Sequence, residues 1–439
     1  MGKCTKGKCM SEEKNEKQKL TKLERSWILY DVGNSAFTML ACTLIPIWFK
    51  TLAIGDGPGQ ITSDQATACW AIITAVVTVI TAVLGPILGT FMDYEGRKKK
   101  FFITTVAVGA AGCLLTGFST NWIIFMAIYI VSRIFYSISL LVYDAMLGDV
   151  TTDERLDLVS SYGYGWGYIG SCAPFFVAMI AYILGPDMKG LLPNRLVMII
   201  GFGVTAVWWF AVTVPLMKRY RQVHYVEKEP GAVRDTFKKL GNTVRRIALE
   251  DKKVLYFLIA FFLYIDGVGT IIDNCINVGT DLGLSTVGQV VTLIITQVVA
   301  FVFSMIFAKL SLKYRTVTLL EICIIGYFCV CLYALTLHSL LGFFILAMGV
   351  GMFQGSIQSL SRSYFTKIIP LEKSGEYFGI YDIFSKGASF LGSALLGIVK
   401  LAGASINIGV ASLAVFFLLG FIFMRICDRT PGAGDRENI

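Results

Sequence analysis

Twelve long apolar runs dominate this sequence, and each has the length of a helix that crosses a membrane. Such a helix needs about 20 apolar residues to span roughly 30 Å of hydrocarbon. Lipid offers the backbone no hydrogen-bond partners, so each run is expected to be helical. The predicted spans are residues 27–50, 66–92, 99–118, 122–147, 160–184, 194–216, 254–278, 284–308, 316–336, 339–362, 375–399 and 405–426.

The composition agrees with a chain that lies mostly in lipid. Of the 439 residues, 55% are hydrophobic and only 16% are charged. A soluble chain of this length would form two or three domains with many more surface charges. The aromatic content of 13% is too high for a disordered chain. We therefore predict an all-α polytopic membrane protein whose 12 transmembrane helices form two six-helix bundles.

A hydrophilic segment divides the predicted spans into two sets of six. The regions are a basic tail at 1–26, a bundle at 27–216, a linker at 217–253, a bundle at 254–426 and a tail at 427–439. In the linker, basic residues are interleaved with apolar ones at helical spacing, which are Val233, Phe237, Leu240, Val244 and Ile247. A basic amphipathic helix of this kind binds the anionic lipids of the inner leaflet. A calmodulin-type target helix is the alternative.

The distribution of lysine and arginine predicts the orientation. Of 39 such residues, 33 fall in the two tails or in connections on the same side, and four fall on the other side. Because cytoplasmic loops carry such an excess, both termini should be cytoplasmic, in a multi-pass protein of the cell membrane. The net charge of +9 therefore reports topology, and no nucleic-acid-binding module is visible.

Sequence signatures of enzymes and of cofactor sites are absent. The two histidines, His224 and His338, are too far apart for a zinc-protease motif. No G-x-S-x-G nucleophile elbow and no G-x-x-x-x-G-K-[ST] phosphate loop occurs. Gly165-x-Gly167-x-x-Gly170 matches a dinucleotide pattern, but it lies in an apolar span, where small residues favour close helix packing. We expect neither an enzyme nor a protein that binds a cofactor or a metal.

The loop between the second and third spans carries the first informative motif, Gly89-Thr-Phe-Met-Asp93-Tyr-Glu-Gly96-Arg97-Lys98. It resembles the loop signature G-x-x-x-D-x-x-G-R-[KR] of the major facilitator superfamily. Gly89 would allow two helices to approach closely. Asp93 can pair with Arg97 or with a helix N-terminus from the other half, and breaking that contact would release a cytoplasmic gate. The corresponding loop after the eighth span has no aspartate, so we expect this contact on one side only.

Five segments resemble a narrower group, the vacuole-effluxer-like family of the major facilitators, and indicate a bacterial-type member. They are Tyr30-Asp-Val-Gly-Asn-Ser-Ala36 and the runs at 143–147, 163–170, 264–267 and 354–365, of which the last is the most specific. The resemblance implies the major facilitator fold and transport by alternating access. It implies a substrate only loosely, through fungal members linked to amino-acid export from the vacuole.

Four charged side chains fall deep inside predicted spans, where an ionisable group is costly and marks a functional site by default. At 1.5 Å of rise per residue, Arg133 lies roughly 16 Å and Asp266 roughly 18 Å from the end where its span enters. Lys386 lies at similar depth, one turn from Asp382. Arg133 or Lys386 would bind a carboxylate and Asp266 an ammonium, as a zwitterion requires. The alternatives are permanent pairs of Asp382 with Lys386 and of Arg133 with Asp266.

Weaker polar stripes complete the predicted site. Asn34 in the first span and Gln354 and Gln358 in the tenth are candidate substrate contacts, although interhelical hydrogen bonds explain the glutamines equally well. Asp31 lies only about 6 Å from the cytoplasmic end of its span, which suits a gate. The candidate coupling or gating residues are Asp31, Asp93, Arg97, Tyr143, Asp144, Asp273 and Asp382.

These features predict a secondary active transporter of small amino acids, with efflux favoured. The alternatives are an ion-coupled transporter of sugars, glycosides or drugs and, from another class, a non-transporting receptor or scaffold. Charges at the midplane favour transport, because a scaffold needs none there. The coupling ion would be a proton carried by Asp266, or sodium, and uncoupled exchange is the third possibility. We expect a monomer with a small-molecule substrate and no nucleic-acid partner.

Overall fold

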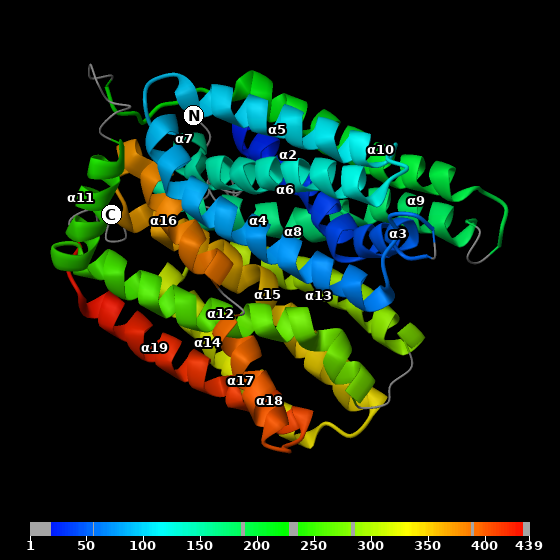
Figure 1. Cartoon of the computed structure of the whole chain (residues 1–439). Coiled ribbons are helices and arrows are strands. Elements are labelled where there is room, and N and C mark those ends of the chain that lie inside the picture. The colour runs from blue at the N-terminus through cyan, green and yellow to red at the C-terminus, as the bar shows by residue number, and fades with distance from the viewer. Residues whose placement is uncertain are drawn as a thin grey trace, which may run out of the picture.

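The structure is a computed structural model that describes residues 19–55, 57–185, 189–227, 236–281, 286–387 and 390–432. Helices make up nearly all of it and lie side by side in broadly the same direction (Figure 1). Within the described residues, extended backbone pairs only at two isolated bridges, Ile54 with Ile61 and Tyr94 with Val226. The first bundle begins and the last helix ends at the same end of the molecule (Figure 1), which we call the terminal face.

The first bundle consists of the helices between Lys22 and Arg219. Capping boxes, Thr21 with Glu24 and Thr62 with Gln65, fix where its first two spans begin. The first span is bent by 42° between two helices, and the fifth is interrupted at Ser171. The helices are α2 (Lys22–Cys42), α3 (Leu44–Ala53), α4 (Ser63–Met92), α5 (Arg97–Thr116), α6 (Trp122–Ala145), α7 (Leu147–Val150), α8 (Leu156–Gly170), α9 (Cys172–Ile183) and α10 (Asn194–Arg219).

The second bundle follows the same plan, and its last span is interrupted at Leu413. Its helices are α12 (Lys252–Asp281), α13 (Thr286–Leu310), α14 (Thr316–Tyr333), α15 (Leu340–Ile368), α16 (Ser374–Gly387), α17 (Phe390–Leu401), α18 (Ile406–Ser412) and α19 (Ala414–Arg429). In the part of the chain that is described, 11 helices are long and apolar enough to cross a membrane, and the bent pair α2–α3 supplies a twelfth. The predicted all-α membrane fold is confirmed.

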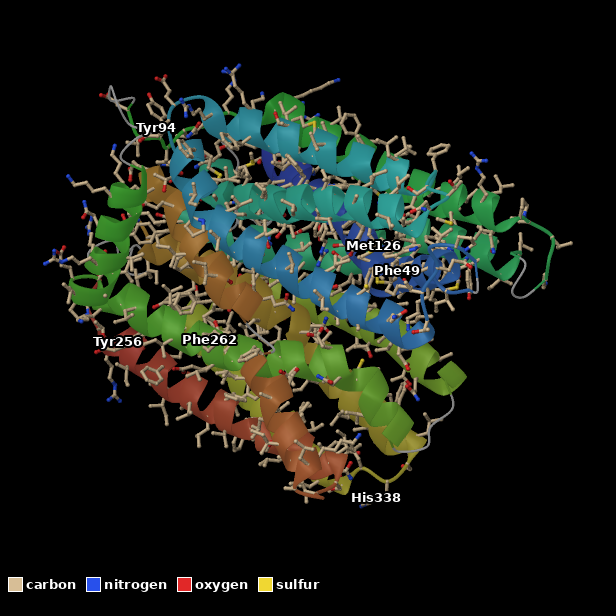
Figure 2. The ribbon with its side chains drawn as sticks, viewed as in Figure 1. Phe49, Tyr94, Met126, Tyr256, Phe262 and His338 are labelled. Carbon is tan, nitrogen blue, oxygen red and sulfur yellow. The ribbon has the colours of Figure 1, made fainter. Side chains whose placement is uncertain are left out.

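Large apolar side chains project from the outer surface of the bundles (Figure 2). Ile72, Val79 and Val83 of α4 are 60–62% exposed, whereas Trp27 and Trp209 of the interior are fully buried. A soluble protein rarely exposes contiguous apolar surface of this extent, and lipid is the solvent that accepts it.

The linker contributes one described helix, α11 (Thr236–Leu249), in the segment where the sequence pattern indicates one. It lies across the terminal face, roughly perpendicular to the spans (Figure 1), and contacts α4 and α12. Thr243 and Ile247 are buried, whereas Val244 is half exposed; Val233 lies outside the described residues. Binding of α11 to anionic lipid stays a prediction.

The two bundles meet near the terminal face through a few helix pairs. α16 lies alongside α4 (Figure 1), and α8 contacts both α13 and α15. Glycines allow the closest of these approaches. A Cβ atom added to Gly89 would lie 2.2 Å from the carbonyl oxygen of Gly375, and one added to Gly379 would lie 2.4 Å from the Cα of Pro86. The α4–α16 contact is therefore backbone against backbone.

Replacing Gly89 with valine is expected to force α4 and α16 apart. The new side chain meets backbone that cannot rotate away, and overpacking of this kind costs about 1–3 kcal/mol. We expect a lower melting temperature and faster hydrogen–deuterium exchange in the first turns of α16. Gly397→Val is the matched control, because a Cβ atom there meets nothing within 4 Å. Equal behaviour of the two variants would contradict the backbone contact.

Candidate functional site

An arginine of the second bundle inserts its side chain into the first bundle near the terminal face. Arg362 of α15 is only 2% exposed. Its Cζ atom lies 4.6 Å from the ring centre of Trp27, 4.6 Å from that of Tyr164 and 5.2 Å from that of Tyr143. These three rings, from α2, α8 and α6, form what we call the aromatic cage. Cation–π attraction to such rings is strongest where water is excluded.

Polar groups of the first bundle bind the same guanidinium. Its Nε donates to Ser160 Oγ at 3.0 Å, and its Nη1 donates to Asp144 Oδ1 at 2.9 Å. Its Nη2 donates to the Ser160 carbonyl oxygen at 3.1 Å and to Asp31 Oδ2 at 3.4 Å. Arg362 is therefore held by directed, charge-assisted hydrogen bonds to a bundle other than its own.

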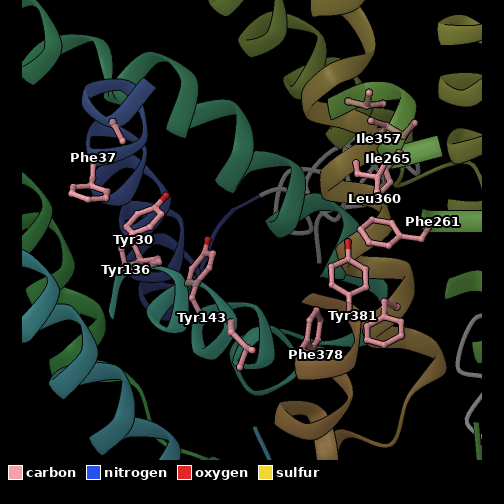
Figure 3. Close-up of a cluster of buried hydrophobic side chains, with 14 of the residues drawn as sticks. Tyr30, Phe37, Tyr136, Tyr143, Phe261, Ile265, Ile357, Leu360, Phe378 and Tyr381 are labelled. Carbon is pink, nitrogen blue, oxygen red and sulfur yellow. The ribbon is translucent and has the colours of Figure 1, made fainter. Parts of the chain in front are cut away.

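Three of the sequence-predicted gating residues, Asp31, Tyr143 and Asp144, meet at this point. The Tyr143 hydroxyl donates to Asp31 Oδ2 at 2.8 Å, and Asn34 Nδ2 donates to Asp31 Oδ1 at 3.2 Å. Asn34, predicted as a substrate contact, thus orients a carboxylate of the cage in this conformation. Figure 3 shows Tyr143 in the buried cluster that continues into the second bundle at Tyr381.

A second ion pair joins the bundles beside the cage. Asp157, in the first turn of α8, accepts hydrogen bonds from Lys367 Nζ at 2.8 Å and from Ser363 Oγ at 2.5 Å, both on α15. Thr316 of α14 donates to the same carboxylate at 2.7 Å. Asp157 and Lys367 are both buried, so the pair is shielded from water on both sides.

The loop motif after α4 makes a third contact between the bundles. Asp93 accepts the backbone N–H groups of Gly375 at 2.7 Å and of Glu376 at 2.9 Å. These residues open α16, so the carboxylate lies at the positive end of the helix dipole. This contact is the second of the two partners predicted for Asp93, a helix N-terminus from the other half. Arg97 instead lies over the Tyr94 ring, 5.4 Å from its centre.

Asp93 is the innermost member of a charged network that reaches the linker. Burial raises the pKa of Asp93 to about 7, although Lys98 and the two N–H groups favour its ionised form. Lys98 Nζ lies 3.8 Å from Asp93 and 3.6 Å from Asp149, and it donates to Ser374 Oγ at 2.8 Å. Asp149 in turn lies 2.8 Å from the Nδ1 atom of His224.

Arg133 presents a buried donor that the described part of the protein does not satisfy. Its Nη1 atom is inaccessible to solvent and has no hydrogen-bond partner there, and its Cζ lies 5.1 Å from the ring centre of Tyr136. Cys42 lies within electrostatic reach of both Arg133 and the exposed Asp273 of α12. A positive charge of the first bundle and a negative charge of the second thus both act on Cys42.

Asp266 is fully buried and binds backbone N–H groups of the first described turn of α17. It accepts the backbone N–H of Gly392 at 2.6 Å and that of Leu391 at 3.1 Å, at the N-terminus of α17. Thr270 donates to it at 3.4 Å. The described contacts of Asp266 are therefore with α17 and with its own helix, and Arg133 is not among them.

The remaining candidates lie in the second bundle. Lys386 donates a hydrogen bond to Asp382, one turn away on α16. In this conformation the two residues therefore form the ion pair that was predicted as the alternative to substrate binding. Gln358 Nε2 donates to the carbonyl oxygen of Gln354 at 3.2 Å, so in this conformation its amide group bonds to its own helix. Gln354 also lines a cavity of about 80 Å³, together with Thr270, Asn274 and Gln297. This volume is enough for a few waters.

Four contact residues were not among the predicted site residues, namely Arg362, Asp157, Lys367 and Lys98, although Lys98 ends the loop motif and Arg362 lies in the segment at 354–365. The predicted tenth span ends at 362, whereas α15 continues to Ile368; α8 likewise begins at Leu156, four residues before the predicted fifth span. Positive residues beyond a span are interpreted as topology signals. Arg362 is the last residue of the predicted span, and continuing the helical pattern past it would have placed Lys367 on the same helix.

Comparison with known proteins connects the chain to one family. A family model described as vacuole effluxer Atg22-like matches residues 20–437. An uncharacterized MFS-type transporter, YxiO of Bacillus subtilis, is 40% identical over 410 residues, which cover 93% of this chain and 95% of the relative. Autophagy-related protein 22-1 of Aspergillus niger is 29% identical over 323 residues, 66% of this chain and 51% of the relative. The chain thus spans about half the length of that fungal relative.

Solved structures share the fold at low sequence identity. The major facilitator transporter FucP, in an outward conformation, matches with a TM-score of 0.68 and 14% identity over 93% of this chain and 98% of its own. The proton:xylose symporter XylE matches with a TM-score of 0.67 and 12% identity, over 94% of this chain and 96% of its own. At such identities the likeness establishes the fold alone.

Proposed function

The chain belongs to the vacuole effluxer Atg22-like family, and from this premise we propose that it exports small amino acids by alternating access. Family and fold together make it a multi-pass transporter of the major facilitator type. The effluxer description of the family supports the direction of transport. We assign the terminal face to the cytoplasm, because it carries the excess of lysine and arginine, and the protein to the plasma membrane.

In this assignment the structure has its cytoplasmic face closed. Arg362 in the aromatic cage, Lys367 on Asp157, and Asp93 on the N-terminus of α16 each join one bundle to the other. All three must separate for the bundles to rock apart, as alternating access about a site between repeats requires. We therefore assign gating to these three contacts.

The buried, unpartnered Nη1 atom of Arg133 is the observation that carries the substrate assignment. A buried donor without a partner costs free energy, and a carboxylate is the group that a guanidinium binds best. Asp273 of the opposite bundle supplies the negative charge that an ammonium group needs. A zwitterionic amino acid between the bundles would give Arg133 Nη1 the carboxylate partner that it lacks and would bring its ammonium group toward Asp273. Asp266 is the proposed proton-coupling residue, because protonation would weaken its hydrogen bonds to α17.

Counterflow in proteoliposomes tests this proposal. The purified protein is loaded with unlabelled amino acids, sugars or nucleosides in turn, and uptake of the labelled compound is followed. We expect accumulation for an amino-acid class and a loss of about 100-fold in Arg133→Gln, because a carboxylate loses its bidentate partner. Arg133→Lys should recover part of the rate.

Arg195→Gln is the control, because Arg195 is exposed at the opposite end of the molecule. Accumulation of sugars alone would preserve the transporter and overturn the substrate. Full activity of Arg133→Gln would overturn the site. Absence of counterflow with every solute, from protein with a normal melting transition, would contradict transport of small amino acids.

A further inference from the structure

The aromatic cage and its carboxylates belong to one bundle, whereas the cation that fills the cage belongs to the other. Trp27, Tyr143 and Tyr164 lie on α2, α6 and α8, which pack against one another in the first bundle or share its core. Asp31, Asp144 and Ser160 lie on the same three helices. Only Arg362 comes from α15. When the bundles separate as rigid bodies, Arg362 leaves and the cage stays intact.

The vacated cage would hold two carboxylates without their cation. Asp31 lies beside three rings in a buried position, and the Asp144 side chain is only 23% exposed. Uncompensated charge in such a place is strongly unfavourable, so the open state needs another cation there. Lys367, on the same helix as Arg362, is paired with Asp157 in the closed state and leaves together with Arg362.

We propose that the open cage binds the guanidinium or ammonium group of an organic cation from the cytoplasm. The inference rests on the proposed transport function and assigns the chemistry of its entry site. The aromatic faces select a delocalised or alkyl cation over a hydrated metal ion, which requires a shell of oxygen ligands. Ser160, Asp144 and Asp31 offer acceptors in the directions of the guanidinium N–H groups. Arg362 fills the cage in the closed state and therefore competes with the solute for this site.

The size of the cage matches one guanidinium with no room to spare. A Cβ atom added to Gly163 would lie 2.5 Å from Asp31 Oδ2, 3.1 Å from the Trp27 ring and 3.2 Å from Arg362 Nη2. Gly163 therefore leaves the space that the cation occupies. A methyl group at this position should exclude any cation from the cage and spare the contacts of Lys367 and Asp93.

Chemical rescue of Arg362→Ala tests the proposal with the full-length protein in lipid nanodiscs. Hydrogen–deuterium exchange of α8 and the last turns of α15 reports closure. We expect faster exchange in the variant, and return toward the wild-type rate with guanidinium or methylguanidinium chloride at low millimolar concentration. Sodium chloride at equal ionic strength should have no effect. Lys367→Ala, which leaves the cage filled, should not be rescued by either salt.

Ligand binding to the wild-type protein provides the second measurement, which does not depend on the folding of Arg362→Ala. L-arginine and its uncharged isostere L-citrulline are compared by isothermal titration calorimetry. We expect about tenfold weaker binding of citrulline, and loss of that preference in Gly163→Ala. Equal binding of the two ligands, or rescue by sodium as good as by guanidinium, would overturn the cation site. Loss of counterflow with intact cation binding would instead overturn the proposed transport function alone.

Discussion

Replacing Arg362 with alanine is expected to shift the molecule from the closed toward the open cytoplasmic face by about two to four orders of magnitude. The closed state would retain Asp31 and Asp144 in a buried place without their cation. Removing one partner of a buried ion pair costs about 3–5 kcal/mol. In the open state Arg362 would face water, so its loss there costs little. Since about 1.4 kcal/mol corresponds to a factor of ten, the opening equilibrium moves by the stated amount.

Distances between spin labels measure this equilibrium directly. Labels at Lys100 of α5 and at Glu372, just before α16, report the separation of the bundles at the terminal face; both residues are exposed. Arg362→Lys should give a smaller shift of the opening equilibrium, because lysine keeps the positive charge but lacks the planar guanidinium group with its several N–H donors.

Arg425→Ala is the matched control for this experiment. Arg425 pairs with Glu321 at 2.9 Å inside the second bundle, and its side chain is 51% exposed. Glu321 is buried, so this control also removes the cation partner of a buried carboxylate, but the pair does not join the bundles and its loss should not favour their separation. An unchanged distance distribution in folded Arg362→Ala protein, or an equal change in both variants, would contradict a gating role for the cage.

The sequence predicted those features that follow from the bilayer itself. Apolar length gives the spans, because a helix must cross a fixed thickness of hydrocarbon. Depth along a helix separated Asp31 and Asp144, which lie in the cage, from Arg133, which does not. The loop motif indicated two alternative partners for Asp93, Arg97 or a helix N-terminus from the other half, and the second contact is present.

Features that depend on packing between spans could not be obtained from one sequence. No proline precedes α17 in the sequence, and Asp266 was not recognised as a partner of the Leu391 and Gly392 N–H groups. Arg362 lies at the edge of an apolar run, where a positive charge is normally interpreted as topology. Which three rings surround it depends on how α2, α6 and α8 meet, and no periodicity within a single helix encodes that.

The second large effect concerns pH and the cytoplasmic gate. Asp93 lies outside the spans, and burial raises its pKa from the ordinary 3.8 to about 7 in the closed state. Once the α4–α16 contact separates, the carboxylate faces water and its pKa returns toward the ordinary value. The closed state therefore binds a proton more tightly than the open state, and low pH favours closure. As pH rises, the cost of burying the ionised carboxylate increasingly favours opening.

We expect the opening equilibrium to increase about tenfold per pH unit from about pH 4 up to about pH 7, and to level off above that value. Across the full difference in pKa this amounts to about 10³-fold. The distance measurement between Lys100 and Glu372, repeated from pH 5.5 to 8.5, follows the upper part of this range. Asp93→Asn should remove the slope and keep the gate as closed as it is at low pH, because the asparagine oxygen can still accept a hydrogen bond from α16.

Neighbouring charges set the controls for this titration. Lys98, Asp149 and His224 lie in the same network, so the difference between the wild type and Asp93→Asn isolates Asp93 from any titration of His224. Glu95→Gln removes an exposed carboxylate two residues away and should leave the slope unchanged. If Asp93→Asn retains the wild-type slope, or if opening falls as pH rises, the buried carboxylate does not set the pH response. A slope that vanishes only in Asp93→Asn would locate the response at the contact with α16, because that contact changes the environment of Asp93 between the two states.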